Sequence, residues 1–133
     1  MEQKVKYAKE IGKIGEAIKR IGNDFGNAPD MKIQSTEDIK KLITKYDVGL
    51  SEFKQTESYF KGIDSPFGFE HDHHLMVNAF SEYVKATEDM VSAVKVEPQV
   101  FTEEPYLIAQ KNQSVAAGKI AKIATELAQK MFP

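Results

Sequence analysis

The sequence contains no cysteine and no tryptophan, and Arg20 is the single arginine among its 18 cationic residues. Without cysteine, the chain has no disulfide bond, no thiol nucleophile and no zinc–thiolate site. With one arginine and a formal net charge of −2, it lacks the guanidinium groups and the basic surface that nucleic-acid-binding proteins direct at phosphates. No apolar run approaches the roughly 20 residues of a membrane-spanning helix. We therefore expect no nucleic-acid partner and no membrane span.

The residues that are present indicate one folded domain. The chain has 133 residues, of which 41% are hydrophobic, and this suffices for a single domain over residues 1–133 with a substantial core. Its first residues are charged and show no signal-peptide pattern. The sequence leaves open whether a leader precedes them, so the expected location is either cytoplasmic or extracytoplasmic.

Apolar residues recur at helical spacing along four stretches, which is the pattern of amphipathic helices. All three histidines lie in the most apolar of these stretches, residues 66–95. Ser65, just before this stretch, can cap the free backbone N–H groups of a helix that starts at residue 66. Pro66 suits the first helical position because it has no N–H to leave unpaired. The predicted helices span residues 2–25, 36–62, 66–95 and 103–132.

Small residues form a stripe beside the apolar face of the first and the last predicted helix. Their members are Ala8, Gly12, Gly15 and Gly22 in the first helix and Ala117, Ala121, Ala124 and Ala128 in the last. Because both stripes lie on the same flank of their helices, an antiparallel pair would bring the two backbones close together. We therefore predict an all-α, up-down-up-down four-helix bundle with these helices in close contact. The alternative is that the glycines only loosen the first helix, at roughly 1 kcal/mol each.

A cluster of polar residues near the start of the third predicted helix is a candidate metal site. Glu70, His71 and His74 share one side of a helix, because spacings of three and four bring side chains together. Imidazole and carboxylate groups suit zinc or iron. The alternative is a solvated first turn whose acids are favoured by the helix dipole. A di-iron centre is excluded, because it needs a second Glu-x-x-His motif and the chain has no further histidine.

Glu57 and His73 both fall on the apolar side of their predicted helices. Counted from the intervening turn, they lie at similar depth in a helical hairpin, and Tyr7 of the first helix lies near that level. We predict that Glu57 and His73 form a buried polar pair, which would raise the pKa of the histidine. The alternative to a functional pair is a structural one that satisfies two polar groups near the end of the bundle.

Several apolar residues fall outside the predicted core faces. Leu107, Ile108 and Val115 lie off both stripes of the last helix, and Val48 and Tyr59 lie on the polar side of the second. Such residues either cover a loop or contact a partner. No nucleophile elbow, oxyanion motif or glycine-rich phosphate loop is present, so we expect a non-enzymatic protein with no cofactor.

Residues 65–90, SPFGFEHDHHLMVNAFSEYVKATEDM, combine a Pro–aromatic helix start, a histidine-containing first turn and a spaced line of Leu, Phe, Tyr, Ala and Met. This segment resembles uncharacterised helical-bundle lipoproteins and surface proteins of Gram-positive bacteria. The lipobox cysteine of such proteins is missing here. The resemblance implies an extracytoplasmic binding or scaffolding role and no catalytic residues.

Three classes of function follow from these patterns. The first is a non-enzymatic binding or interaction module for an unknown protein partner. The second is a helical bundle that binds a small ligand or a metal. The third is a cytosolic or phage-encoded accessory protein that self-associates through the third or the fourth predicted helix. A dimer that buries Leu107, Ile108 and Val115 would favour this class.

Overall fold

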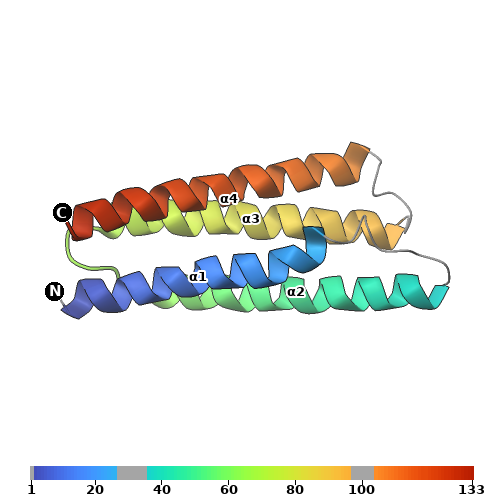
Figure 1. The fold of residues 1–133 in the computed structure, drawn as a ribbon, viewed down its shortest axis with the longest axis horizontal. Coiled ribbons are helices and arrows are strands. Elements are labelled where there is room, and N and C mark those ends of the chain that lie inside the picture. Colours follow the sequence, from blue (N-terminus) through green and yellow to red (C-terminus); the bar gives the residue numbers. More distant parts are fainter. Residues whose placement is uncertain (1, 27–35, 97–103) are drawn as a thin grey trace.

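The computed structural model of the chain describes residues 2–26, 36–96 and 104–133, which form four α-helices and contain no strand. Helix α1 spans Glu2–Gly26, α2 spans Thr36–Gly62, α3 spans Glu70–Val96 and α4 spans Glu104–Met131 (Figure 1). The predicted ends of three helices agree with these bounds to within one residue, although residue 103 lies outside the described ranges. The predicted start of α3 differs.

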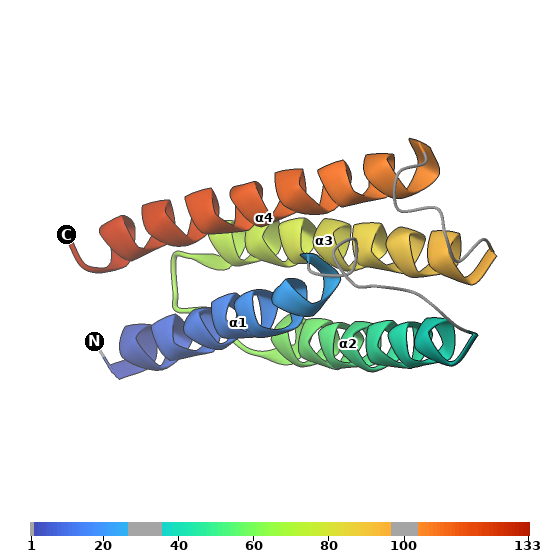
Figure 2. The same ribbon diagram turned by 45° about the vertical axis from the view of Figure 1, so that its right-hand side comes forward.

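Consecutive helices run antiparallel, so the predicted up-down-up-down bundle is confirmed (Figure 1). The chain begins and ends at the same end of the bundle in both views (Figures 1 and 2). Each helix packs against the next one in the sequence, and α4 also packs against α1. The packing is most extensive between α3 and α4 and least extensive between α1 and α4. The side of the bundle between α1 and α4 is therefore its most open side.

Side chains from all four helices meet in one core. The rings of Phe53 and Tyr83 meet edge to face with 5.1 Å between their centroids, which joins α2 to α3. Burying a side chain of this size contributes about 1.5–3 kcal/mol. Helix α4 buries Ala109 and Ala116, whose short side chains allow the close approach to α3. The largest fully buried side chains are Tyr7, Ile14, Tyr46, Phe53, Phe60, Met76, Phe80, Met90 and Leu127.

The helix start predicted at residue 66 is wrong, because residues 66–69 form a turn before α3. The N–H of Phe69 donates to the carbonyl of Pro66 at 3.0 Å. Gly68 has a φ of +90°, which L side chains rarely adopt. The carboxylate of Glu70 accepts a hydrogen bond from the Gly68 N–H at 3.3 Å. Because of this turn, α3 starts at Glu70 and not at residue 66. The side chains of α2 and α3 that lie at the same height along the bundle axis are therefore not the predicted ones.

A buried hydrogen-bonded pair joins α3 to α4. The hydroxyl of Thr87 donates to the carbonyl of Tyr83 at 2.9 Å and accepts from the side-chain amide of Gln113 at 2.8 Å. Both side chains are buried, so their polar atoms need these partners. The sequence placed Thr87 on the apolar face of its helix, but it gave no reason to select Gln113.

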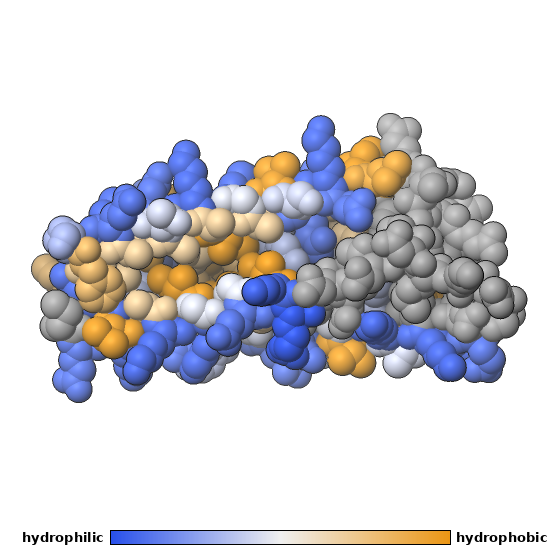
Figure 3. All heavy atoms as spheres, in the orientation of Figure 1, coloured by the Kyte–Doolittle hydropathy of each residue, from blue (hydrophilic) through white to orange (hydrophobic). Residues whose placement is uncertain are grey.

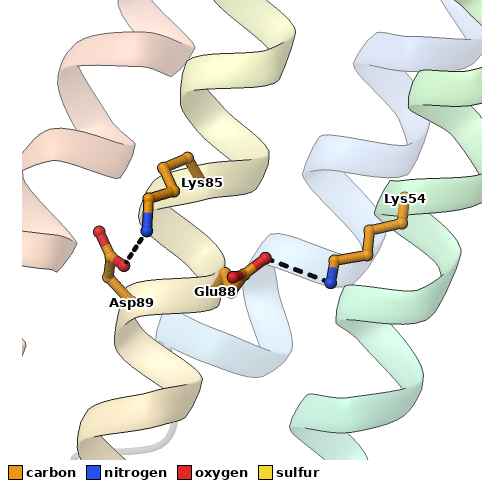
Figure 4. Close-up of polar contacts among 4 residues, drawn as sticks. All are labelled: Lys54, Lys85, Glu88 and Asp89. Atoms are coloured by element: carbon orange, nitrogen blue, oxygen red, sulfur yellow. Dashed lines mark hydrogen bonds and ion pairs between the residues drawn. The ribbon is translucent and has the colours of Figure 1, made fainter.

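Several ion pairs lie on the outer surface of the bundle. Figure 4 shows Lys54 of α2 reaching Glu88 of α3 at 3.2 Å, and Lys85 paired with Asp89 within α3 at 2.8 Å. Comparable pairs join other neighbouring helices, namely Arg20–Glu52 at 3.0 Å, Lys119–Glu82 at 2.9 Å and Lys130–Asp72 at 3.1 Å. Exposed pairs of this kind contribute about 0–1 kcal/mol each, so the apolar core supplies most of the stability.

Candidate functional site

The predicted close contact between the glycines of α1 and the alanines of α4 does not form. Gly12 and Gly15 are exposed, and a Cβ atom built on either would meet no atom within 4 Å. Gly22 lies outside the described side chains. A hydrogen bond at one end of the bundle still connects the two helices, from the Lys4 ammonium group to the carbonyl of Met131 at 3.4 Å.

An apolar surface between the two helices takes the place of this contact, and we call it the α1–α4 seam. Figure 3 shows apolar side chains gathered between the two helices on the face toward the viewer. Ile11 and Ile18 pack against the core and stay partly exposed, while Ala121 and Ala128 are exposed. The residues that define the seam are Ala8, Ile11, Gly12, Gly15 and Ile18 of α1 and Ala117, Ala121, Ala124 and Ala128 of α4.

His73 lies in an aromatic cluster made by three helices. Its Nδ1 is 2.5 Å from the hydroxyl oxygen of Tyr7 on α1, and its ring centroid is 4.8 Å from that of Phe60 on α2. The predicted pair with Glu57 does not form. The Glu57 carboxylate instead lies 3.9 Å from the Lys61 ammonium group. Because α3 starts four residues later than predicted, the α2 side chain level with His73 is Phe60.

The electrostatic surroundings of His73 also differ from the prediction. Burial, followed by the charge of His74, lowers the pKa of His73, whereas the predicted carboxylate partner would have raised it. Burial, followed by the charge of Asp72, raises the pKa of Tyr7. A neutral imidazole and a protonated phenol fit together when the Tyr7 hydroxyl donates to Nδ1, which leaves the ring proton on Nε2. The cluster is a structural contact with a pH-dependent charge state.

The candidate metal residues do not converge. Glu70, His71 and His74 are all exposed on the first turns of α3. Glu70 turns back toward the Gly68 N–H and so acts as part of the turn that precedes the helix. No group of three or more His, Cys, Asp or Glu side chains within residues 2–26, 36–96 and 104–133 is arranged to hold a metal ion. The structure therefore does not assemble the predicted site.

The apolar residues predicted to lie outside the core are exposed. Leu107, Ile108 and Val115 lie on the outward side of α4, and Val115 keeps 51% of its surface in contact with solvent. Phe67, in the turn before α3, is 92% exposed. Leu107 and Ile108 lie near the start of α4, at the opposite end of the bundle from the turn that holds Phe67, so these exposed side chains do not form one continuous surface.

Sequence reasoning missed Glu10, whose carboxylate lies largely buried between α1 and α2. A helical wheel places Glu10 between Ile14 and Ala17, within the apolar face of α1, so its position was recognisable. Within the part of the chain that the structure describes, no helix is both long enough and apolar enough to cross a membrane.

No family model, curated protein or solved structure matches this chain, so its function is inferred from the geometry of the described residues.

Proposed function

We propose that the protein is a non-enzymatic interaction module that binds an amphipathic helix of a partner protein in the α1–α4 seam. The observation that supports this proposal is the row of aliphatic and small side chains that stays exposed along that seam (Figure 3). Contiguous apolar surface of this kind commonly marks an interaction site in soluble proteins. An extracytoplasmic location, which the resemblance to surface proteins implies, stays a prediction.

The composition of the seam suits a helix better than an extended peptide. Gly12, Gly15 and Ala121 carry little or no side chain, so a further helix can approach both α1 and α4 closely. Ile11 and Ile18 lie seven residues apart, or about two helical turns, which matches the repeat of an amphipathic helix. An extended peptide would bind mainly through unpaired strand edges, and the described residues contain no strand.

Site-specific photo-crosslinking in the native host tests this proposal. A photoreactive amino acid at Ala121 lies in the seam, and the same residue at Ser58 lies on an exposed part of α2 and serves as the matched control. We expect a discrete protein adduct from position 121, with the crosslinked peptide mapping to an apolar face of a helix, and no such adduct from position 58.

Three outcomes would contradict the proposal. Equal adducts from positions 121 and 58 would indicate nonspecific labelling. A failure of position 121 to crosslink would remove the seam as a docking surface. An adduct composed of two copies of this chain would assign the seam to self-association and not to a partner protein.

The outward side of α4 supports a second candidate function, self-association. Leu107, Ile108 and Val115 expose aliphatic surface opposite the core face of the helix, in the position where a second copy would bury it. Native mass spectrometry distinguishes the candidates. A dimer that dissociates in Val115→Lys would support self-association through α4, whereas a monomer at micromolar concentration would oppose it.

A further inference from the structure

A small pocket lies between the first turns of α1 and the end of α2, on a different side of the bundle from the α1–α4 seam. Its volume is about 350 Å³. The lining includes Lys6, Tyr7 and Glu10 from α1, Tyr59 near the end of α2, and Asp64 in the connection that follows. The pocket is therefore built by two helices and a loop, all within the described residues.

Glu10 supplies the observation that points to a ligand. Its side chain is only 11% exposed, although carboxylates are rarely buried without full pairing. One carboxylate oxygen lies 3.2 Å from the Lys13 ammonium group. The other oxygen is buried and has no hydrogen-bond partner among the described residues. A buried carboxylate oxygen without a donor is unfavourable, so a donor from outside the chain would improve this arrangement.

The charges around the pocket favour a positively charged donor. Glu10 and Asp64 contribute two carboxylates against the single ammonium group of Lys6. Helix α2 ends at Gly62, which also lines the pocket, and the C-terminal end of a helix carries partial negative charge. Among the residues that line this pocket, the two carboxylates outnumber the ammonium group of Lys6, while Lys13, which pairs with one oxygen of Glu10, lines the adjacent hollow.

Tyr59 adds an aromatic surface at the same place. Its side chain is 56% exposed and lines both this pocket and the adjacent hollow that Lys13 and Arg20 help to form. The face of a tyrosine ring attracts ammonium and guanidinium groups. The other phenol of the pocket, Tyr7, already uses its hydroxyl in the hydrogen bond with His73.

We propose that this pocket binds an organic cation, with Glu10 as the counter-ion and Tyr59 as the aromatic surface. The ligand carries an ammonium or guanidinium group on a short carbon chain. It comes either as a free polyamine or as a lysine or arginine side chain of a bound protein. This site is independent of the proposed function, because helix docking uses the α1–α4 seam.

An NMR titration of the ¹⁵N-labelled full chain at low ionic strength tests the site. The probes are spermidine, N-acetyl-lysine-methylamide and the uncharged N-acetyl-norleucine-methylamide. We expect saturable shifts at the amides of residues 6–10 and 59–64 with the two cations, and at least tenfold weaker binding of the uncharged compound. Tighter binding of spermidine would identify a free amine as the ligand, and tighter binding of the lysine compound would identify a protein side chain.

Glu10→Gln is the decisive variant, because it keeps the shape of the side chain and removes its charge. We expect it to weaken binding of the cations at least tenfold. Glu16→Gln is the matched control, since Glu16 is an exposed carboxylate on the same helix and should leave binding unchanged. Non-saturable shifts, equal binding of the uncharged compound, or full binding by Glu10→Gln would each overturn the proposal. None of these outcomes would affect the crosslinking test of the seam.

Discussion

Gly15 has helical backbone geometry and Gly68 has a positive φ, so replacing each glycine with alanine should change the stability in opposite directions. Gly15 is an exposed position inside α1 with open space around its Cβ direction. We expect Gly15→Ala to stabilise the protein by about 0.5–1 kcal/mol, because alanine loses less backbone entropy in a helix. Gly68 has a φ of +90°, so we expect Gly68→Ala to destabilise it by about 1–2 kcal/mol. Urea denaturation of both variants measures the two changes.

These substitutions also test how α1 lies in the bundle. If Gly15→Ala destabilised the protein, a close neighbour would have to face Gly15, as the small-residue stripe predicted. Gly118→Ala in α4 is a further control, since its Cβ would also meet nothing within 4 Å and should give a similar gain. The stripe on α1 was visible in the sequence, but the distance between α1 and α4 depends on how all four helices pack.

The buried pair between α3 and α4 predicts an asymmetric response to mutation. Thr87→Val leaves the amide of Gln113 buried without its partner, so we expect a loss of about 1–3 kcal/mol. Gln113→Leu leaves the Thr87 hydroxyl still bonded to the carbonyl of Tyr83, so the expected loss is smaller. In the double variant, Thr87→Val should cost less than it does alone. A double-mutant cycle by chemical denaturation measures this coupling, and additive losses would contradict it.

The four helices could be predicted because each repeats its apolar residues over many turns, and single errors average out. The start of α3 could not be predicted with the same rule. Pro66 matches the first position of a helix, but the conformation of Gly68 and its bond to Glu70 place Pro66 in a turn. The later start of α3, by about one helical turn, also explains why Glu57 does not pair with His73. The prediction that Tyr7 lies at the same height along the bundle as His73 is confirmed by their hydrogen bond.

The stability of the whole molecule depends on a core that all four helices share, and Phe53 is the most direct test of it. Its side chain is fully buried and meets two rings of α3 edge to face, those of Phe80 and Tyr83. We expect Phe53→Ala to lower the free energy of unfolding by about 3–5 kcal/mol, because it leaves a cavity that the helices cannot fully close. Tyr59→Ala is the control on the same helix, since that ring is exposed and its loss should change stability by less than about 1 kcal/mol.

His73 couples the stability of the bundle to pH. Because burial lowers its pKa below the ordinary 6.5, the unfolded chain binds the proton more readily than the folded chain. The stability therefore holds above about pH 6.5 and falls as the pH decreases toward the folded-state pKa. One such group gives a slope of at most about 1.4 kcal/mol per pH unit. Urea denaturation between pH 7.5 and 5.5 measures the slope before most carboxylates titrate.

His73→Gln should flatten this pH slope, because glutamine still offers an acceptor to Tyr7 but does not titrate. His71→Gln is the matched control, since His71 is exposed on the same turn and should leave the slope unchanged. A slope of the same size in His73→Gln would assign the pH dependence to other groups. An increase in stability toward acid would mean that folding raises the pKa of His73, as the predicted pairing with Glu57 required. The charge state of one imidazole at the junction of α1, α2 and α3 would then report how this end of the bundle is packed.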